Sequence, residues 1–301
     1  MRPASAWRRP ANGRYAPLAV RRLLRDSMKP AARALLAIYD RVIFYLCLAE
    51  FVLLSLGWSV VASLLHLVLP RRLGRRIGRF GMMLSCRLFL ATLTLTGRFH
   101  FDLRALDALR DEKAMIIAPN HPSLWDAVMM ASRLPDMAII MKAMILDNVL
   151  LGGGARLARY IPNDSVRRMI CLALDELRSG SHVLLFPEGT RTVTPPIGRI
   201  TGAVGVIACR ARVPVQTVLV ETNSRFLSKR WPAWRKPDLP LSYQVRLGRR
   251  FDAPVNSAAF VGELQQYFSA SLAAVVPGAV VPAGVADAAP PVSGEPTPSI
   301  E

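Results

Sequence analysis

The chain has 301 residues, enough for one large domain or two small ones, and 52% of them are hydrophobic. Its formal net charge is +18, from 39 lysines and arginines against 21 acidic residues. A chain that is both apolar and basic predicts a protein held at an anionic membrane surface, with anionic lipids as partners. We predict no nucleic-acid partner, because the sequence has no basic recognition helix, zinc-ligand spacing or aromatic RNA-binding signature.

The four cysteines are scattered and form no Cys-x-x-Cys pair. They stand at Cys47, Cys86, Cys171 and Cys209. This pattern predicts reduced core or lipid-facing thiols in a reducing compartment. We expect no metal site and no cofactor.

Residues 1–41 are a basic N-terminal segment, either a solvated tail or a contact for lipid headgroups. The segment does not have the layout of a cleavable signal, because the long apolar run begins only after Arg41 and no small-residue cleavage site follows that run.

Residues 42–98 are predicted to be membrane-anchoring helices. The almost continuously apolar run 42–69 would form a helix about 42 Å long, against a hydrocarbon core of about 30 Å. This helix could cross the bilayer with a tilt, or bend at Gly57 and re-enter, and the sequence leaves both open. A second apolar helix is expected at 80–96, after a basic link at 71–79.

Residues 99–276 are predicted to be one catalytic α/β domain, because strand and helix patterns alternate from residue 114 onward. Its sheet should be mixed but mostly parallel, and flanked by helices. The expected strands are 114–118, 137–142, 182–186, 215–221 and 242–248. The expected helices are 122–133, 143–158, 165–179, 199–211 and 260–276. Residues 277–301, rich in Ala, Pro, Val and Gly, are predicted to be a disordered tail.

The first candidate site is residues 120–126, Asn-His-Pro-Ser-Leu-Trp-Asp, which follow the first of these strands. We expect Pro122 to open the next helix, so that His121 lies at the strand-to-helix corner and Asp126 inside the helix. From there the carboxylate can turn back and fix the imidazole tautomer, which leaves the other ring nitrogen free to take a proton from a hydroxyl. The pattern predicts a catalytic dyad, with a surface pair as the alternative.

The second candidate site is the turn 187–192, Pro-Glu-Gly-Thr-Arg-Thr, into which the strand 182–186 runs. This turn offers backbone N–H groups, a hydroxyl and a guanidinium together. Such a set suits an anion, in particular a phosphate.

The two segments resemble the His-x4-Asp and Phe-Pro-Glu-Gly-Thr-Arg motifs of the glycerolipid acyltransferase family. Their order and separation are similar to those of its lysophosphatidic acid acyltransferase branch, and the likeness covers roughly residues 93–251. It implies that His121 is the general base and Asp126 its support.

The resemblance also implies a substrate-binding turn. In it, Arg191 would bind the acceptor phosphate, Glu188 would orient Arg191 or the glycerol hydroxyls, and Gly189 and Thr190 would lie against the substrate. Lys142 is a candidate second cation or an ordinary surface lysine.

The implied activity is transfer of a fatty acyl group from acyl-CoA or acyl carrier protein to the free hydroxyl of a lysophospholipid. The expected acceptor is 1-acylglycerol 3-phosphate, which gives phosphatidic acid in phospholipid biosynthesis. The expected location is a bacterial inner membrane, with the active site on the cytoplasmic side. Where the family has an aspartate-arginine pair, this chain has Asn163-Asp164-Ser165, which leaves the acceptor headgroup open.

Other features keep alternatives open. Gly152-Gly153-Gly154 lacks the residues of a nucleotide-binding loop and is expected to be a turn. Trp231 and Trp234 stand among cations, in either a membrane-interface loop or a packing loop. The alternative functions are the same chemistry on another lysolipid or lipidated metabolite, a non-catalytic membrane scaffold, or a hydrolase with Ser123 as nucleophile.

Overall fold

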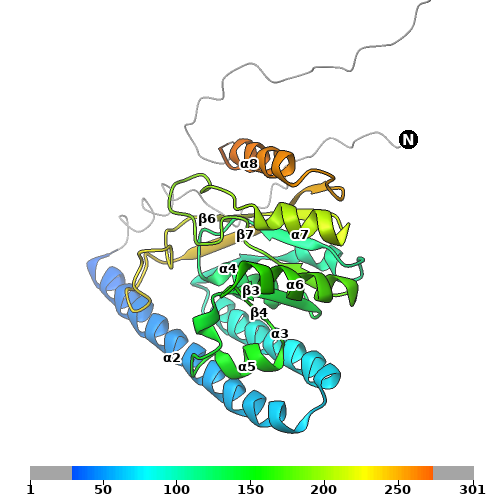
Figure 1. Ribbon diagram of the computed structural model, residues 1–301. Helices are drawn as coiled ribbons and strands as arrows, with labels where there is room; N and C mark the ends of the chain where they lie inside the picture. The colour runs from blue at the N-terminus through cyan, green and yellow to red at the C-terminus, as the bar shows by residue number, and fades with distance from the viewer. Residues whose placement is uncertain (1–28, 274–301) are drawn as a thin grey trace, which may run out of the picture.

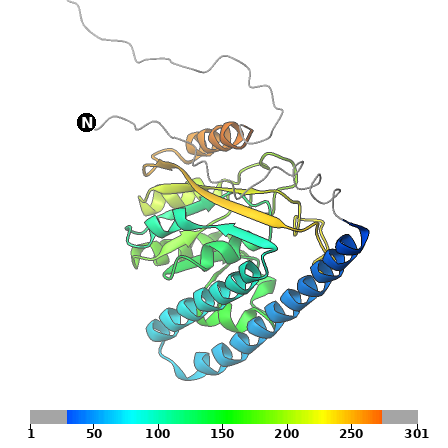
Figure 2. The same cartoon turned by 180° about the vertical axis from the view of Figure 1, so that it is seen from behind.

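A computed structural model describes residues 29–273, in which two long helices precede a sheet with helices on both faces (Figures 1 and 2). The α/β fold class predicted from the strand and helix alternation is confirmed. The predicted disordered tail and most of the predicted basic N-terminal segment lie outside the described residues.

The sheet has seven strands in the order β1-β7-β6-β2-β5-β3-β4. The strands are β1 (Phe99–Asp102), β2 (Ile116–Pro119), β3 (Met137–Met141), β4 (Ile161–Pro162), β5 (His182–Leu184), β6 (Val215–Thr222) and β7 (Leu241–Phe251). The β6–β7 pair is antiparallel and all other neighbours are parallel, so the predicted mixed, mostly parallel sheet is correct. The short strands β1 and β4 lie at its two edges and were not predicted.

Helices cover both faces of this sheet. They are α2 (Pro30–Val68), α3 (Arg71–Leu95), α4 (Trp125–Ala131), α5 (Gly152–Leu157), α6 (Val166–Arg178), α7 (Ala203–Ala211) and α8 (Ser257–Ala273), with short 3-10 helices η1 (Arg104–Leu109) and η2 (Ala143–Ile145). One core joins α2, α3, α4 and α5 to the sheet, and the other core joins α6, α7 and α8 to its opposite face. Along β2, Ile117 belongs to the first core, whereas Ile116 and Ala118 belong to the second, as a strand buried on both faces requires.

Several predicted boundaries were wrong. Helix α2 begins at Pro30 and runs without a break through Gly57, and the supposed basic link 71–79 is the first part of α3. Helix α4 begins at Trp125, so Pro122 is not its first residue.

The expected glycine turn is also wrong, because Gly152, Gly153 and Gly154 open helix α5. Close packing explains the three glycines. A Cβ at Gly153 would lie 2.1 Å from the carbonyl oxygen of Ser59, and a Cβ at Gly154 would lie 2.8 Å from the Trp58 ring. Only glycines let α5 approach α2 this closely.

Helix α2 lies along the domain and is attached to it at both ends (Figures 1 and 2). Near its start the buried Asp40 pairs with both Nε and Nη2 of Arg98, at 2.5 and 2.8 Å. Near its end the Ser59 hydroxyl accepts a hydrogen bond from the N–H of Gly153 at 3.1 Å.

Helix α2 also has an exposed apolar face, which includes Leu35, Ile38, Leu46, Leu53, Leu64 and Leu67. Within residues 29–273, α2 is the one helix whose length and composition would allow it to cross a membrane.

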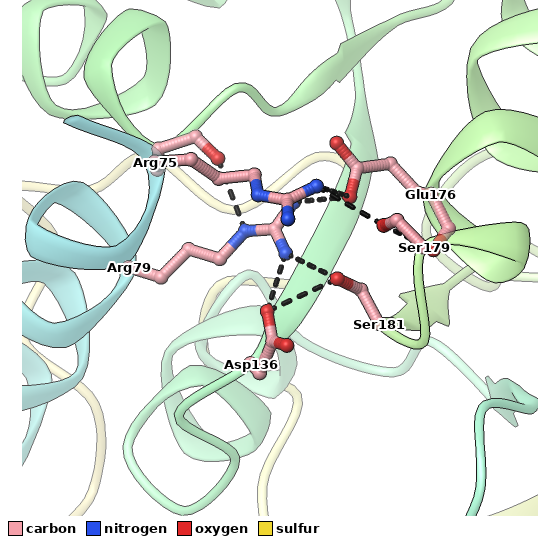
Figure 3. A network of polar contacts seen from close by, with 7 residues as sticks. Arg75, Arg79, Asp136, Glu176, Ser179 and Ser181 are labelled. Carbon is pink, nitrogen blue, oxygen red and sulfur yellow. Dashed lines mark hydrogen bonds and ion pairs between the residues drawn. The ribbon is translucent and has the colours of Figure 1, made fainter. Parts of the chain in front are cut away.

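Helix α3 is joined to the α/β domain through Arg79, whose side chain is only 2% exposed (Figure 3). Its guanidinium donates to Asp136 at 2.5 Å, to Glu176 at 2.8 Å and to the Ser181 hydroxyl at 2.8 Å. Its Nε donates to the Ala158 carbonyl at 3.1 Å. Burial alone would raise the pKa of Asp136, but the hydrogen bond and charge of Arg79 outweigh it and hold that pKa below its ordinary value.

Candidate active site

The two candidate segments leave the sheet side by side. Strands β2 and β5 are parallel neighbours, with Ile116 opposite Val183. The segments that follow them therefore emerge at the same edge. The backbone N–H of Thr192 donates to the carbonyl of His121 at 2.7 Å, which fixes one segment against the other. The two candidate segments are therefore held side by side at one edge of the sheet.

His121 and Asp126 form the predicted pair, with Nδ1 of the imidazole 2.9 Å from Oδ2 of the carboxylate. Asp126 is the second residue of α4 and is fully buried, whereas His121 precedes the helix and is partly exposed. The N–H of Ser123 donates to the same Oδ2 at 2.8 Å, which holds the carboxylate turned back toward the corner.

The carboxyl group of Asp126 is poorly solvated. Burial raises the pKa of Asp126, and the hydrogen bonds from His121 and Ser123 offset only part of that rise. Its other oxygen, Oδ1, is buried and has no hydrogen-bond partner within residues 29–273. A carboxylate so poorly solvated gains when the imidazole beside it becomes charged.

The imidazole ring is also held from its face. Phe186, at the end of the second segment's strand run, stacks on His121 with ring centroids 3.7 Å apart and planes 18° apart. Phe186 is the first residue of the second motif, but the sequence did not predict that its ring would contact His121. With Nδ1 bound to Asp126 and one face covered, Nε2 is the ring nitrogen left for a substrate.

Glu188 holds the two segments together and also lines the polar hollow beside Thr190 and Arg191. Its Oε1 accepts from the N–H of His121 at 3.1 Å and from the Thr192 hydroxyl at 2.7 Å. Its Oε2 accepts from the N–H of Gly198 at 2.8 Å, and the side chain is buried. The next residue, Gly189, has a φ of +64°, a conformation that favours glycine.

Arg191 projects from the same turn toward the loop after β6. Its Nη1 donates to the carbonyls of Leu227 at 2.9 Å and Ser228 at 3.1 Å. Thr190 and Arg191 also border a second, more polar hollow, which Arg199 lines as well. The guanidinium is therefore positioned by backbone carbonyls.

One cavity of about 590 Å³ joins these groups. His121, Gly189, Thr190, Arg191 and Lys142 line it, so both predicted clusters open into the same space. The rest of its wall is mostly apolar and comes from the N-terminal helices and their neighbours, including Phe51, Trp58, Met82, Phe89, Trp125 and Tyr160. An apolar cavity with a few polar groups at one end suits a ligand with a hydrocarbon chain and a reactive head.

Ser123, the nucleophile of the hydrolase alternative, is fully buried. Its hydroxyl lies 3.3 Å from the Tyr243 hydroxyl and accepts from the N–H of Trp125 at 3.3 Å. It does not line the cavity. Within the described part of the chain, no group of three or more His, Cys, Asp or Glu residues could hold a metal ion.

Comparison with known proteins agrees with this arrangement. Residues 100–221 match the Acyltransferase family model. A curated relative, the 1-acyl-sn-glycerol-3-phosphate acyltransferase of Pseudomonas aeruginosa, is 24% identical over 233 residues, which cover 75% of this chain and 85% of that protein. The fold is similar to the crystal structure of the 1-acyl-sn-glycerophosphate (LPA) acyltransferase PlsC from Thermotoga maritima, with a TM-score of 0.59 and 16% identity, covering 79% of this chain and 95% of that one.

The matches to the Acyltransferase model and to the curated relative support an acyltransferase, and the solved structure shows that the fold is shared. Within that class, the resemblance to the lysophosphatidic acid acyltransferase branch of the glycerolipid acyltransferases is confirmed.

Proposed function

We propose that the protein is a membrane-bound O-acyltransferase that moves a fatty acyl group from acyl-CoA or acyl carrier protein to the free hydroxyl of 1-acylglycerol 3-phosphate, giving phosphatidic acid. The observation that carries the proposal is the His121–Asp126 pair, 2.9 Å apart, at the polar end of an apolar cavity. The name of the Pseudomonas aeruginosa relative supports this choice of acceptor.

In the proposed reaction, Nε2 of His121 accepts the proton of the acceptor hydroxyl as its oxygen attacks the thioester carbonyl carbon. The tetrahedral intermediate collapses, the C–S bond breaks, and the imidazolium returns its proton to the leaving thiolate. Because the thioester is already activated, no covalent acyl-enzyme is needed. The buried, partnered hydroxyl of Ser123 agrees with this direct route.

Asp126 lowers the barrier by stabilising the imidazolium that forms at His121. Burial raises the pKa of Asp126, so its ionised form is poorly stabilised until the imidazolium forms beside it. Backbone N–H groups of the turn that contains Gly189 are the proposed donors to the oxyanion.

The acceptor phosphate is proposed to bind Arg191, with Lys142 as a second cation on the same cavity wall. Glu188 is proposed to act on the substrate only indirectly. It would keep the turn that carries Arg191 against the N–H of His121.

Membrane binding is proposed to use the exposed apolar face of α2. Because α2 is attached to the domain near both ends, it would lie within one leaflet and not cross the bilayer. Anionic lipids would add electrostatic attraction to the +18 chain. We place the enzyme at the cytoplasmic face of a bacterial inner membrane, where acyl thioesters are available.

The central test is His121→Ala, assayed with an acyl thioester and 1-acylglycerol 3-phosphate in mixed micelles. We expect kcat to fall about 10²–10⁴-fold, the usual contribution of a general base. His66→Ala, a histidine of α2 that does not line the cavity, is the matched control and should keep its activity. A folded His121→Ala enzyme with normal kcat would remove the base from the mechanism.

The acceptor site is tested with Arg191→Ala and Arg191→Lys. KM for the phosphorylated acceptor should rise more than KM for the donor in the alanine variant, and the lysine variant should recover part of the difference. An unchanged acceptor KM would exclude Arg191 from phosphate binding.

A second candidate is the same chemistry on another lysolipid. It is favoured by Asn163, which lines the cavity where the family has an aspartate-arginine pair. The neighbouring Asp164 instead pairs with Arg168 on α6, at 2.8 Å. A panel of lysolipids with different headgroups separates the candidates by kcat/KM.

A further inference from the structure

The loop between β6 and β7 carries two tryptophans in different surroundings. Trp231 packs edge-on against Phe226 with centroids 6.0 Å apart, and its indole N–H donates to the Arg235 carbonyl at 2.9 Å. The guanidinium of Arg235 lies 5.0 Å above the same ring. Trp234, in contrast, is 71% exposed. The packing interpretation therefore holds for Trp231 and leaves Trp234 without a structural explanation.

This loop, residues 223–240, lies beside the N-terminal half of α2, as both views of the molecule show (Figures 1 and 2). The rings of Phe226 and Phe44 are in edge contact, with centroids 5.9 Å apart. Lys229 and Ala233 line the apolar cavity. The loop is thus adjacent both to the helix with the exposed apolar face and to the space proposed for the substrates.

The loop is also strongly basic. Its exposed cations are Arg225, Lys229, Arg230 and Arg235, and its one acidic residue is Asp238. The neighbouring part of α2 adds the exposed Arg33 and Arg41. A loop with an exposed indole and several exposed cations has the composition of a segment at a membrane–water interface, where the ring enters the headgroup layer and the cations meet lipid phosphates.

We propose that loop 223–240 is a second membrane-binding element, in which Trp234 inserts among the headgroups of an anionic bilayer while Arg225, Lys229 and Arg230 bind lipid phosphates. The inference rests on the proposed membrane function and adds a site to it. The loop and α2 would then bring the cavity between them to the lipid surface, so that a lysolipid can enter without leaving the leaflet.

The test is fluorescence of the full-length protein on phosphatidylcholine vesicles with and without phosphatidylglycerol, using lipids brominated near the headgroup as quenchers. The difference spectrum between the wild type and Trp234→Phe isolates the emission of Trp234. On anionic vesicles we expect that difference emission to shift to the blue and to be quenched. Trp231→Phe is the matched control, because its packed ring should contribute no lipid quenching.

The charges are tested with Arg225→Gln, Lys229→Gln and Arg230→Gln together. Each cation near an anionic membrane contributes about 1 kcal/mol of binding free energy, a factor of about five in affinity. The affinity of the triple variant for anionic vesicles should therefore fall by at least about 10-fold, while its affinity for neutral vesicles stays constant. Neutralising Arg178, Arg210 and Arg212, at the ends of α6 and α7, removes the same charge elsewhere and should have less effect.

Two results would overturn the proposal. One is a Trp234 emission that vesicles do not change. The other is an emission that responds to acidic acyl carrier protein but not to lipid, which would make the loop a donor-docking surface. An acyl-transfer assay in micelles separates this inference from the proposed acyltransferase function. If the protein transfers acyl groups but its Trp234 emission does not respond to lipid, only the membrane-binding role of the loop is refuted.

Discussion

Replacing Arg79 with methionine tests how the N-terminal helices are joined to the catalytic domain. The side chain is 2% exposed and bonds to Asp136, Glu176, Ser181 and the Ala158 carbonyl (Figure 3). Methionine keeps much of the length and apolar volume but removes the charge and the donors.

The expected cost follows from what each partner loses. Removing one member of a buried ion pair costs about 3–5 kcal/mol. Glu176 would keep Arg75 at 3.1 Å, and Asp136 is 61% exposed and can be hydrated, so the low end applies. We therefore expect about 3 kcal/mol, or a fall in Tm of roughly 6–12 °C at the usual 2–4 °C for each kcal/mol.

Arg75→Met is the matched control in the same cluster. Arg75 is 25% exposed and bonds to Glu176 and Ser179, and Glu176 would keep Arg79. The expected cost is at most about 1 kcal/mol. Thermal unfolding of both variants in detergent micelles gives the comparison. Equal Tm values for the two variants would refute the view that Arg79 is the main polar contact between the N-terminal helices and the catalytic domain.

The other predictions concern the cavity wall and the dyad. A Cβ at Gly81 would lie 2.1 Å from the ring of Trp58, so Gly81→Ala should lower the free energy of unfolding by about 1–3 kcal/mol. In a Trp58→Ala background the same substitution should cost less, and additive changes in unfolding free energy would contradict this contact. Asp126→Asn should lower kcat about 10²–10⁴-fold while the midpoint of denaturation stays level or rises. Burial raises the folded-state pKa of Asp126, so the free energy of unfolding of the wild type should fall as pH rises above the ordinary pKa of a carboxyl group. Asp126→Asn should not show this fall, and parallel curves of stability against pH for the two proteins would argue against the raised pKa. Phe186→Leu should remove the stacking on His121 and lower kcat more than KM, and a change confined to KM would show that Phe186 only lines the substrate space.

Local patterns were enough to predict the core of the fold. The central strands are short apolar runs, and His121 and Arg191 follow two of them. The dyad was predictable because a residue just outside a helix and one just inside it can face each other. The Asp126 geometry confirms this, even though the helix begins later than expected.

Contacts between distant segments could not be predicted in the same way. The glycines at 152–154 indicate a turn when considered alone, and only the closeness of α2 explains why they are helical. In the sequence, Glu188 resembled a substrate ligand. Its carboxylate accepts hydrogen bonds from residues 121, 192 and 198, and these contacts could not be predicted because the three residues are not adjacent to it in the chain. The environments of Trp231 and Trp234 differ because of Phe226 and α2, which no local pattern shows.

The attachment of α2 limits how the enzyme can be shortened. Phe44 and Cys47 of α2 belong to the same core as Phe89 of α3 and Met129 of α4. Deleting the N-terminal helices to obtain a water-soluble fragment would thus strip one wall from the cavity and expose its interior to solvent. Preparations for crystallography or inhibitor screening should retain both helices and supply detergent or nanodiscs.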